Sequence, residues 1–187
     1  MAAIIHLATL DLAFAEPSIK LAQKGIHRVP IIIQGFQIRP ATRYPLATYQ
    51  LFKTNKSGKA QPIPFQIDEI NQWGDYVLPH GSEITSKTGN NIFDLQDELA
   101  LMGDDVGPVS PPKTWPENLR PTLVYELRFD LPNPPKGVKS EGAVYLGIFF
   151  RNKPKPSMRN YVNYSPSKQG VKTSRYHYKF DRLNYLV

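Results

Sequence analysis

Proline accounts for 18 of the 187 residues, about twice its usual share, and no other feature constrains the fold as strongly. A proline inside a helix removes a backbone hydrogen bond and clashes with the preceding turn, whereas turns and strand ends tolerate it. After the N-terminus, no stretch of ten or more residues has helical periodicity. The prolines therefore favour short strands joined by turns over a helix bundle.

Apolar runs bounded by proline and glycine mark the clearest strands. Residues 122–130 predict the clearest strand: apolar and aromatic side chains at every second position face one way, and Glu126, Arg128 and Asp130 lie on the other face. Residues 144–150 are apolar on both faces, as in a central strand covered on each side. Residues 44–52 are followed by the polar turn 54–59, which predicts a hairpin.

Three other runs are less clear. Residues 29–33, continued by Phe36 and Ile38, predict one buried strand. Residues 95–102 fit either a strand or a turn of helix. The run around Tyr178 alternates aromatic and basic side chains, which predicts a half-buried strand with a solvated basic face.

About eight or nine such strands predict an all-β fold, a mostly antiparallel β-sandwich with long loops and few or no helices after the N-terminus. Jelly-roll-like connectivity is one arrangement that this pattern allows. We expect a single domain over residues 29–187, after an N-terminal linker or edge segment at 16–28. The last residues are apolar, so a truncated domain and a terminal strand are both open readings.

The first fifteen residues predict a signal peptide. An apolar run at 4–10 precedes Ala13 and Ala15, the small-x-small pattern that signal peptidase reads, and it is too short to span a bilayer. No basic residue precedes Lys20 and Asp11 interrupts the run, so a short docked helix is the alternative. Export would place the protein in the periplasm or outside the cell, and we expect no transmembrane segment elsewhere.

The chain has no cysteine, which excludes disulfides, thiolate zinc sites, iron–sulfur clusters and a cysteine nucleophile. Its formal charge of +7 is unevenly distributed. Residues 1–111 carry 9 basic and 11 acidic side chains, whereas residues 112–187 carry 14 basic and 5 acidic ones. The basic part favours an anionic polysaccharide or an acidic partner, while the period-two separation of aromatic and charged side chains makes nucleic acid a poor fit.

Two acidic clusters lie in the polar stretches between residues 66 and 105: Gln66, Asp68 and Glu69, then Asp97 and Glu98. Paired carboxylates can bind calcium or act as acid and base. Residues 94–105 lack the ligand pattern of an EF-hand loop. We expect a polar network that holds these loops, with a hard cation such as calcium as the alternative and no other cofactor.

The same loops carry Trp73 and Tyr76, which can stack on a sugar ring or anchor a protein partner. The alternative for Trp73 is that it pins the loop to the core. His80, also in this stretch, is a lone candidate for acid–base chemistry. No nucleophile elbow or glycine-rich phosphate loop is present, so we assign no catalytic residue.

A second candidate surface is the basic, proline-broken loop with Arg151, Lys153 and Lys155, followed by Arg159. These side chains can hold carboxylates or sulfates of an anionic ligand. They can equally keep a sheet edge soluble.

Residues 62–69 (PIPFQIDE) and 97–102 (DELALM) resemble a pattern in uncharacterised exported bacterial β-sandwich proteins. Residues 159–164 (RNYVNY) and 174–176 (SRY) are similar to a later feature of the same group. The first segment is more distantly similar to the N-terminal β-sandwich modules of polysaccharide lyases. The resemblance implies a secreted β-sandwich module and suggests carbohydrate, and it implies no catalytic residue here.

These observations lead to three functional hypotheses. The first is an exported, non-catalytic binding or structural module that uses the 66–105 loops to contact a polysaccharide or protein partner in the cell envelope. The second is an enzyme or enzyme subunit that acts on an anionic polysaccharide. The third is a basic subunit of a larger envelope assembly, docked on an acidic partner.

Overall fold

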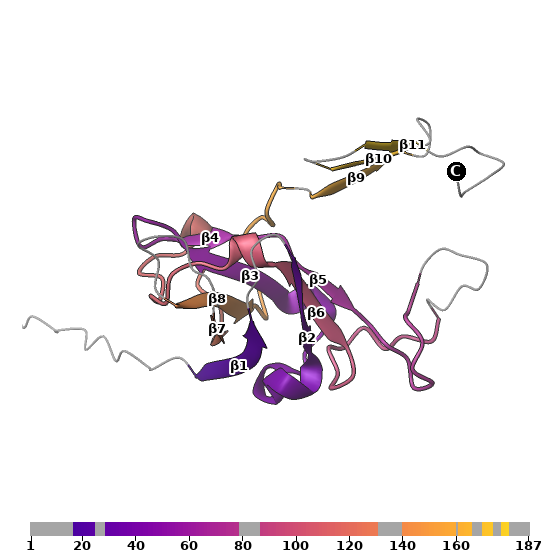
Figure 1. The fold of residues 1–187 in the computed structure, drawn as a ribbon. Coiled ribbons are helices and arrows are strands. Elements are labelled where there is room, and N and C mark those ends of the chain that lie inside the picture. The colour runs from indigo at the N-terminus through magenta and orange to yellow at the C-terminus, as the bar shows by residue number, and fades with distance from the viewer. Residues whose placement is uncertain are drawn as a thin grey trace, which may run out of the picture.

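The computed structural model describes residues 17–24, 29–78, 87–130, 140–159, 161–165, 170–173 and 177–179. Within these residues the chain is mostly β, and its strands form three largely antiparallel sheets (Figure 1). The helical elements described are short 3₁₀ turns: η1 (Gly35–Ala41), η2 (Leu46–Thr48), η3 (Gly103–Asp105) and η4 (Pro116–Asn118). The predicted all-β, mostly antiparallel class is confirmed.

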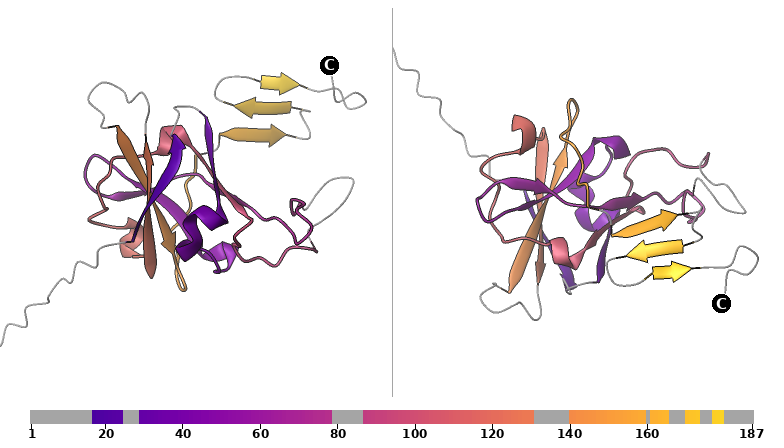
Figure 2. Two further views of the ribbon diagram at one scale, coloured as in Figure 1. Left: turned by 60° about the horizontal axis from the view of Figure 1, so that its bottom comes forward. Right: turned by 90° about the horizontal axis from the view of Figure 1, so that it is seen from above.

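The large sheet has five strands in the order β1 (Ser18–Lys24), β7 (Leu123–Asp130), β8 (Glu141–Ile148), β3 (Tyr49–Thr54) and β4 (Ala60–Pro62). The small sheet has three, β2 (Pro30–Gln34), β6 (Glu98–Met102) and β5 (Gln66–Asp68), in that order. The C-terminal sheet has the order β11 (His177–Lys179), β10 (Gly170–Thr173) and β9 (Val162–Ser165). Figure 2 shows the C-terminal sheet to one side of the other two.

The large and small sheets pack face to face in a sandwich-like arrangement. Ile33 and Leu99 of the small sheet share a fully buried cluster with Leu51, Leu127 and Leu146 of the large sheet. Each such side chain stabilises the fold by roughly 1.5–3 kcal/mol relative to an exposed one. This cluster is the main core.

The other face of the large sheet is also covered. Phe52, Tyr145 and Phe149 form a second buried cluster, and Trp115 packs edge-on against Phe52 with the ring centroids 5.1 Å apart. Strand β8 lies at the centre of the sheet and is buried on both faces, as its sequence predicts. The predicted hairpin is confirmed as β3 and β4.

Strand β2 corrects one prediction. It ends at Gln34, and Phe36 and Ile38 belong to η1 instead of continuing the strand. A Cβ atom at Gly35 would lie 1.9 Å from the carbonyl oxygen of Asp94, so only glycine permits this close approach of the two backbones. The turn leaves the Phe36 side chain 60% exposed, and β2 is an edge strand buried on one face only.

The N-terminal strand β1 pairs with β7 in parallel, at the edge of the large sheet. The hydroxyl of Ser18 donates to the Glu126 carboxylate at 3.0 Å, and Lys20 forms exposed ion pairs with Asp130 and Glu141. Leu21 is buried in the main core. The predicted edge segment at 16–28 thus contains a strand, whereas residues 1–15 lie outside the described chain.

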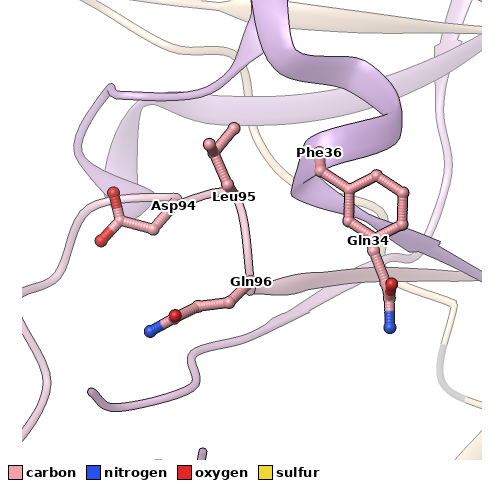
Figure 3. A pocket seen from close by; sticks show the side chains of 5 residues that line it. All are labelled: Gln34, Phe36, Asp94, Leu95 and Gln96. Carbon is pink, nitrogen blue, oxygen red and sulfur yellow. The ribbon is translucent and has the colours of Figure 1, made fainter.

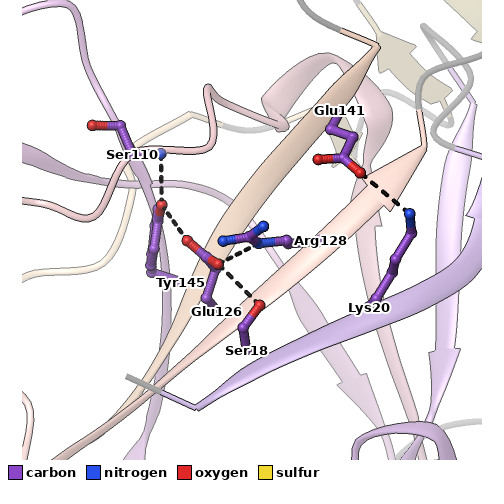
Figure 4. Close-up of polar contacts among 7 residues, drawn as sticks. All are labelled: Ser18, Lys20, Ser110, Glu126, Arg128, Glu141 and Tyr145. Carbon is purple, nitrogen blue, oxygen red and sulfur yellow. Dashed lines mark hydrogen bonds and ion pairs between the residues drawn. The ribbon is translucent and has the colours of Figure 1, made fainter. Parts of the chain in front are cut away.

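Glu126 lies on the face of β7 opposite the main core, and it is buried. Its carboxylate accepts hydrogen bonds from Ser18, from Arg128 Nε at 2.5 Å and from the Tyr145 hydroxyl at 3.0 Å (Figure 4). The backbone N–H of Ser110 donates to the Tyr145 hydroxyl at 3.0 Å. The proline-rich segment that contains Ser110 therefore helps to cover the face of β7 opposite the main core.

Two runs of uncertain character are resolved. Residues 98–102 form strand β6, with Leu99 and Leu101 facing the core. In β11 all three described residues are exposed, Tyr178 to 65%, so the expected half-buried strand is not observed there.

In the part of the chain that the structure describes, no helix has the length and hydrophobicity needed to cross a membrane.

Candidate functional site

The described residues between 66 and 105 form a surface at one end of the small sheet, which we call the loop surface. Its loops extend outward from β5 and β6 (Figure 1). In the full sequence, residues 66–105 contain nine carboxylate side chains and one basic side chain, Lys87. The loop surface therefore lies in the most acidic part of an otherwise basic protein.

Asp97 and Glu69 fix the backbone of these loops. Asp97 is fully buried, and its two carboxylate oxygens accept the backbone N–H groups of Ile70 at 2.8 Å and Asp94 at 2.6 Å. One oxygen of Glu69 accepts the N–H groups of Asn90 and Asn91, the latter at 2.8 Å. Both carboxylates thus serve as hydrogen-bond acceptors within the loops.

Asn71 closes a tight turn, a role that the sequence analysis missed. Its side-chain oxygen accepts the N–H groups of Trp73 at 3.0 Å and Asp75 at 2.9 Å, and Gly74 adopts a φ of 89°. An Asx turn of this kind is detectable in the pattern Asn-x-x-Gly-Asp. The Gln96 amide donates to the carbonyl groups of Ile70 and Asn71, which ties the turn to the segment before β6.

This turn presents Trp73 to solvent. The Trp73 side chain is 67% exposed, so it does not pin the loop to the core. Tyr76 is 48% exposed and its hydroxyl donates to Glu98 at 3.0 Å, an interaction that raises the Tyr76 pKa. The loop surface thus combines a fixed backbone with exposed aromatic side chains.

Asp68 and Glu98 lie opposite each other in the antiparallel pair of β5 and β6. Asp68 accepts a hydrogen bond from the Gln66 amide. Among the described residues, neither carboxylate forms an ion pair with a basic side chain. The predicted network is therefore divided, with Asp97 and Glu69 inside the loops and Gln66, Asp68 and Glu98 at their surface.

A pocket of about 540 Å³ adjoins the loop surface where η1 meets the segment before β6 (Figure 3). The amides of Gln34 and Gln96, the Asp94 carboxylate and the rings or methyl groups of Phe36 and Leu95 line it. The Gly35 contact with Asp94 brings the two segments together. The pocket offers polar hydrogen-bonding groups beside an exposed aromatic ring.

The described residues contain no group of three or more histidine and carboxylate side chains arranged to hold a metal ion. In Asp97 the oxygens are occupied by backbone N–H groups, and they do not face a common centre with another carboxylate. His80 lies outside the described residues. The calcium alternative and the acid–base alternative therefore gain no geometric support.

Two of the four predicted anion-binding side chains, those of Lys153 and Arg159, contact the protein itself. Lys153 Nζ donates to the carbonyl groups of Ala47 and Tyr49, and burial lowers its pKa. The backbone N–H of Lys155 donates to Glu117. Residues 151–159, which follow β8, thus contact the body at several points, and we call them, together with Tyr161, the strap.

The end of the strap is fixed by Arg159, whose Nη1 lies 3.0 Å from the buried Asp105 carboxylate and whose guanidinium lies 4.8 Å from the centre of the Tyr161 ring. Asp105 also faces Lys53 at 3.6 Å. Arg151 and the side chain of Lys155 are exposed. The four basic residues therefore do not converge on one anion site.

Comparison with known proteins adds no relative. No protein-family model matches the chain, and searches of curated proteins and of solved structures return no match.

Proposed function

We propose that the protein is an exported, non-catalytic binding module that uses the loop surface to hold a polysaccharide chain. One observation carries the proposal: Trp73 is exposed on a turn whose backbone is fixed by the Asn71 side chain. A rigid exposed aromatic side chain loses little conformational entropy on binding, and the apolar face of a sugar ring packs well against it. The neighbouring pocket adds the polar side chain of Gln34 and the exposed ring of Phe36.

The charge of the loop surface favours a neutral polysaccharide. Nine carboxylates against one lysine would repel uronic acid or sulfated chains. An enzyme acting on an anionic polysaccharide would need converging cations, but Lys153 and Arg159 are engaged by the protein. A neutral ligand therefore fits these charges better than an anionic one.

Replacing Trp73 with alanine is expected to weaken binding to a neutral polysaccharide at least tenfold, because a large part of the contact area is lost. The melting temperature should change little, since an exposed side chain contributes about 0.5 kcal/mol or less to stability. Affinity electrophoresis against neutral, uronic acid and sulfated polymers measures both the affinity and the preference.

The matched control is Tyr178→Ala, which removes an equally exposed aromatic side chain from the C-terminal sheet and should leave binding unchanged. Neutral binding should vary little with salt. Salt-sensitive binding to anionic polymers would favour the enzyme alternative. Absence of binding to every polymer would reject polysaccharide as the ligand and direct attention to a protein partner.

Export has its own test. The small residues at 13 and 15 predict cleavage before Glu16, and strand β1 begins at Ser18, so the cut would spare the strand. Protein recovered from the periplasm of an expression host should have the intact mass of residues 16–187. An Ala15→Asp variant should retain the full mass. Uncleaved wild-type protein confined to the cytoplasm would contradict export.

A further inference from the structure

A second cavity, of about 290 Å³, lies between the outer face of the small sheet and the end of the strap. We call it the strap groove. Its lining is largely apolar and comes from β2, β5, β6, β9 and their flanks: Pro30, Phe65, Ala100, Met102, Tyr161 and Val162. Neither Trp73 nor the residues of the pocket beside Phe36 line it.

An ion pair between Arg159 and the buried Asp105 carboxylate holds the strap side of the groove in place. Arg159 contacts both the Asp105 carboxylate and the Tyr161 ring, and Asp105 also faces Lys53. Pro154, earlier in the strap, is buried. The groove is therefore formed before any ligand arrives.

One polar atom in this wall has no hydrogen-bond partner. The Tyr161 hydroxyl is shielded from solvent and unpaired in the described chain. A buried hydroxyl normally finds a partner, because leaving it unpaired is costly. Because the hydroxyl has no exposed surface, it lies within the packing of this wall and is not a contact for an occupant of the groove.

Beyond the apolar part, the same face of the sheet becomes acidic. The strand registers place Ala100 opposite Gln66 and, two residues along, Glu98 opposite Asp68. Like charges directly opposite each other on neighbouring strands repel, and neither carboxylate has a recorded basic partner in the described residues. A cationic group at this position would relieve the repulsion.

We propose that the strap groove binds an extended peptide of a partner protein, with an aliphatic side chain over Ala100 and a Lys or Arg two residues away beside Asp68 and Glu98. Side chains two residues apart on an extended chain are spaced like those on the sheet beneath, about 7 Å. The cavity volume accommodates an aliphatic side chain with its backbone.

The test uses the full chain and labelled, end-capped peptides in fluorescence anisotropy. The parent peptide is Gly-Ser-Leu-Thr-Arg-Ser-Gly. We expect it to bind with a Kd of roughly 10–100 μM, and at least tenfold more tightly than versions with Glu in place of Arg or Gly in place of Leu. A Kd above about 1 mM for the parent, or equal binding of the Glu peptide, overturns the proposal.

Variants locate the binding. Ala100→Arg fills the groove and should abolish peptide binding, while polysaccharide binding through Trp73 persists, so the two proposals fail independently. The double variant Asp68→Asn with Glu98→Gln should remove the preference for Arg over Glu. Asp75→Asn, a carboxylate outside the groove lining, is the matched control and should change nothing. A preference that survives the double variant contradicts the assignment.

Discussion

Replacing Asp97 with alanine is expected to lower the free energy of unfolding by about 3 kcal/mol. The fully buried carboxylate accepts the backbone N–H groups of Ile70 and Asp94, and the variant leaves both donors without a partner. Urea denaturation followed by tryptophan fluorescence measures the change. Because these donors fix the loop surface, binding through Trp73 should weaken in the same variant.

Asp68→Ala is the matched control. Asp68 is partly exposed, accepts a hydrogen bond from Gln66 among the described residues, and faces the like charge of Glu98. Its removal should change stability by about 0.5 kcal/mol or less. Equal effects of the two variants would contradict the division of the acidic residues into buried and surface groups.

The buried carboxylate of Asp97 also predicts that the stability of the protein depends on pH. Burial raises the pKa of Asp97 above its ordinary value, although hydrogen bonds from Asp94 and Ile70 oppose the rise. The folded state then binds the proton more tightly than the unfolded state, so the Asp97 contribution to stability falls as pH rises from the unfolded pKa through the folded one. Asp97→Ala should remove this contribution from the pH profile.

The second large effect is expected at Glu126. Glu126→Ala should lower the free energy of unfolding by about 3 kcal/mol, because it leaves the Arg128 guanidinium and the Ser18 hydroxyl without their shared acceptor. Hydrogen exchange should show faster exchange along β1 than along β3, since Glu126 links β1 to the sheet.

Glu126→Gln tests the role of charge. The amide keeps an acceptor for one donor but cannot hold Arg128 by charge, so an intermediate loss of stability is expected. Lys20→Ala is the control, because its ion pairs with Asp130 and Glu141 are exposed and contribute little. A larger loss from the Lys20 variant than from the Glu126 variant would contradict this account of how β1 is held.

The pattern of neighbouring residues in the sequence predicted the strands and turns that such residues determine. The two-faced apolar run at 144–150 identified the central strand, and the polar turn after residue 54 identified the β3–β4 hairpin. Phe36 was misassigned because β2 ends at a backbone contact between Gly35 and Asp94, which are far apart in sequence. Alternation cannot detect such a contact.

The same limit applies to the candidate site: the sequence identifies features that neighbouring residues determine and misses those that depend on distant contacts. Sequence alone selected Trp73 and Asp97, because an aromatic in a polar loop and a carboxylate before a strand stand out. It missed Glu126, since burial there comes from a segment that folds over the sheet from elsewhere in the chain. It also assigned Lys153 and Arg159 to an anion, whereas their acceptors, Ala47 and Asp105, lie more than fifty residues away.

The parallel pairing of β1 with β7 has a consequence for the order of folding. Ser18 and Glu126 are 108 residues apart, so the first strand to be synthesised cannot dock until most of the chain exists. Contacts of such long range slow folding, because a large loop must close before they form. Removal of β1 would leave β7 as an open edge for another chain to occupy.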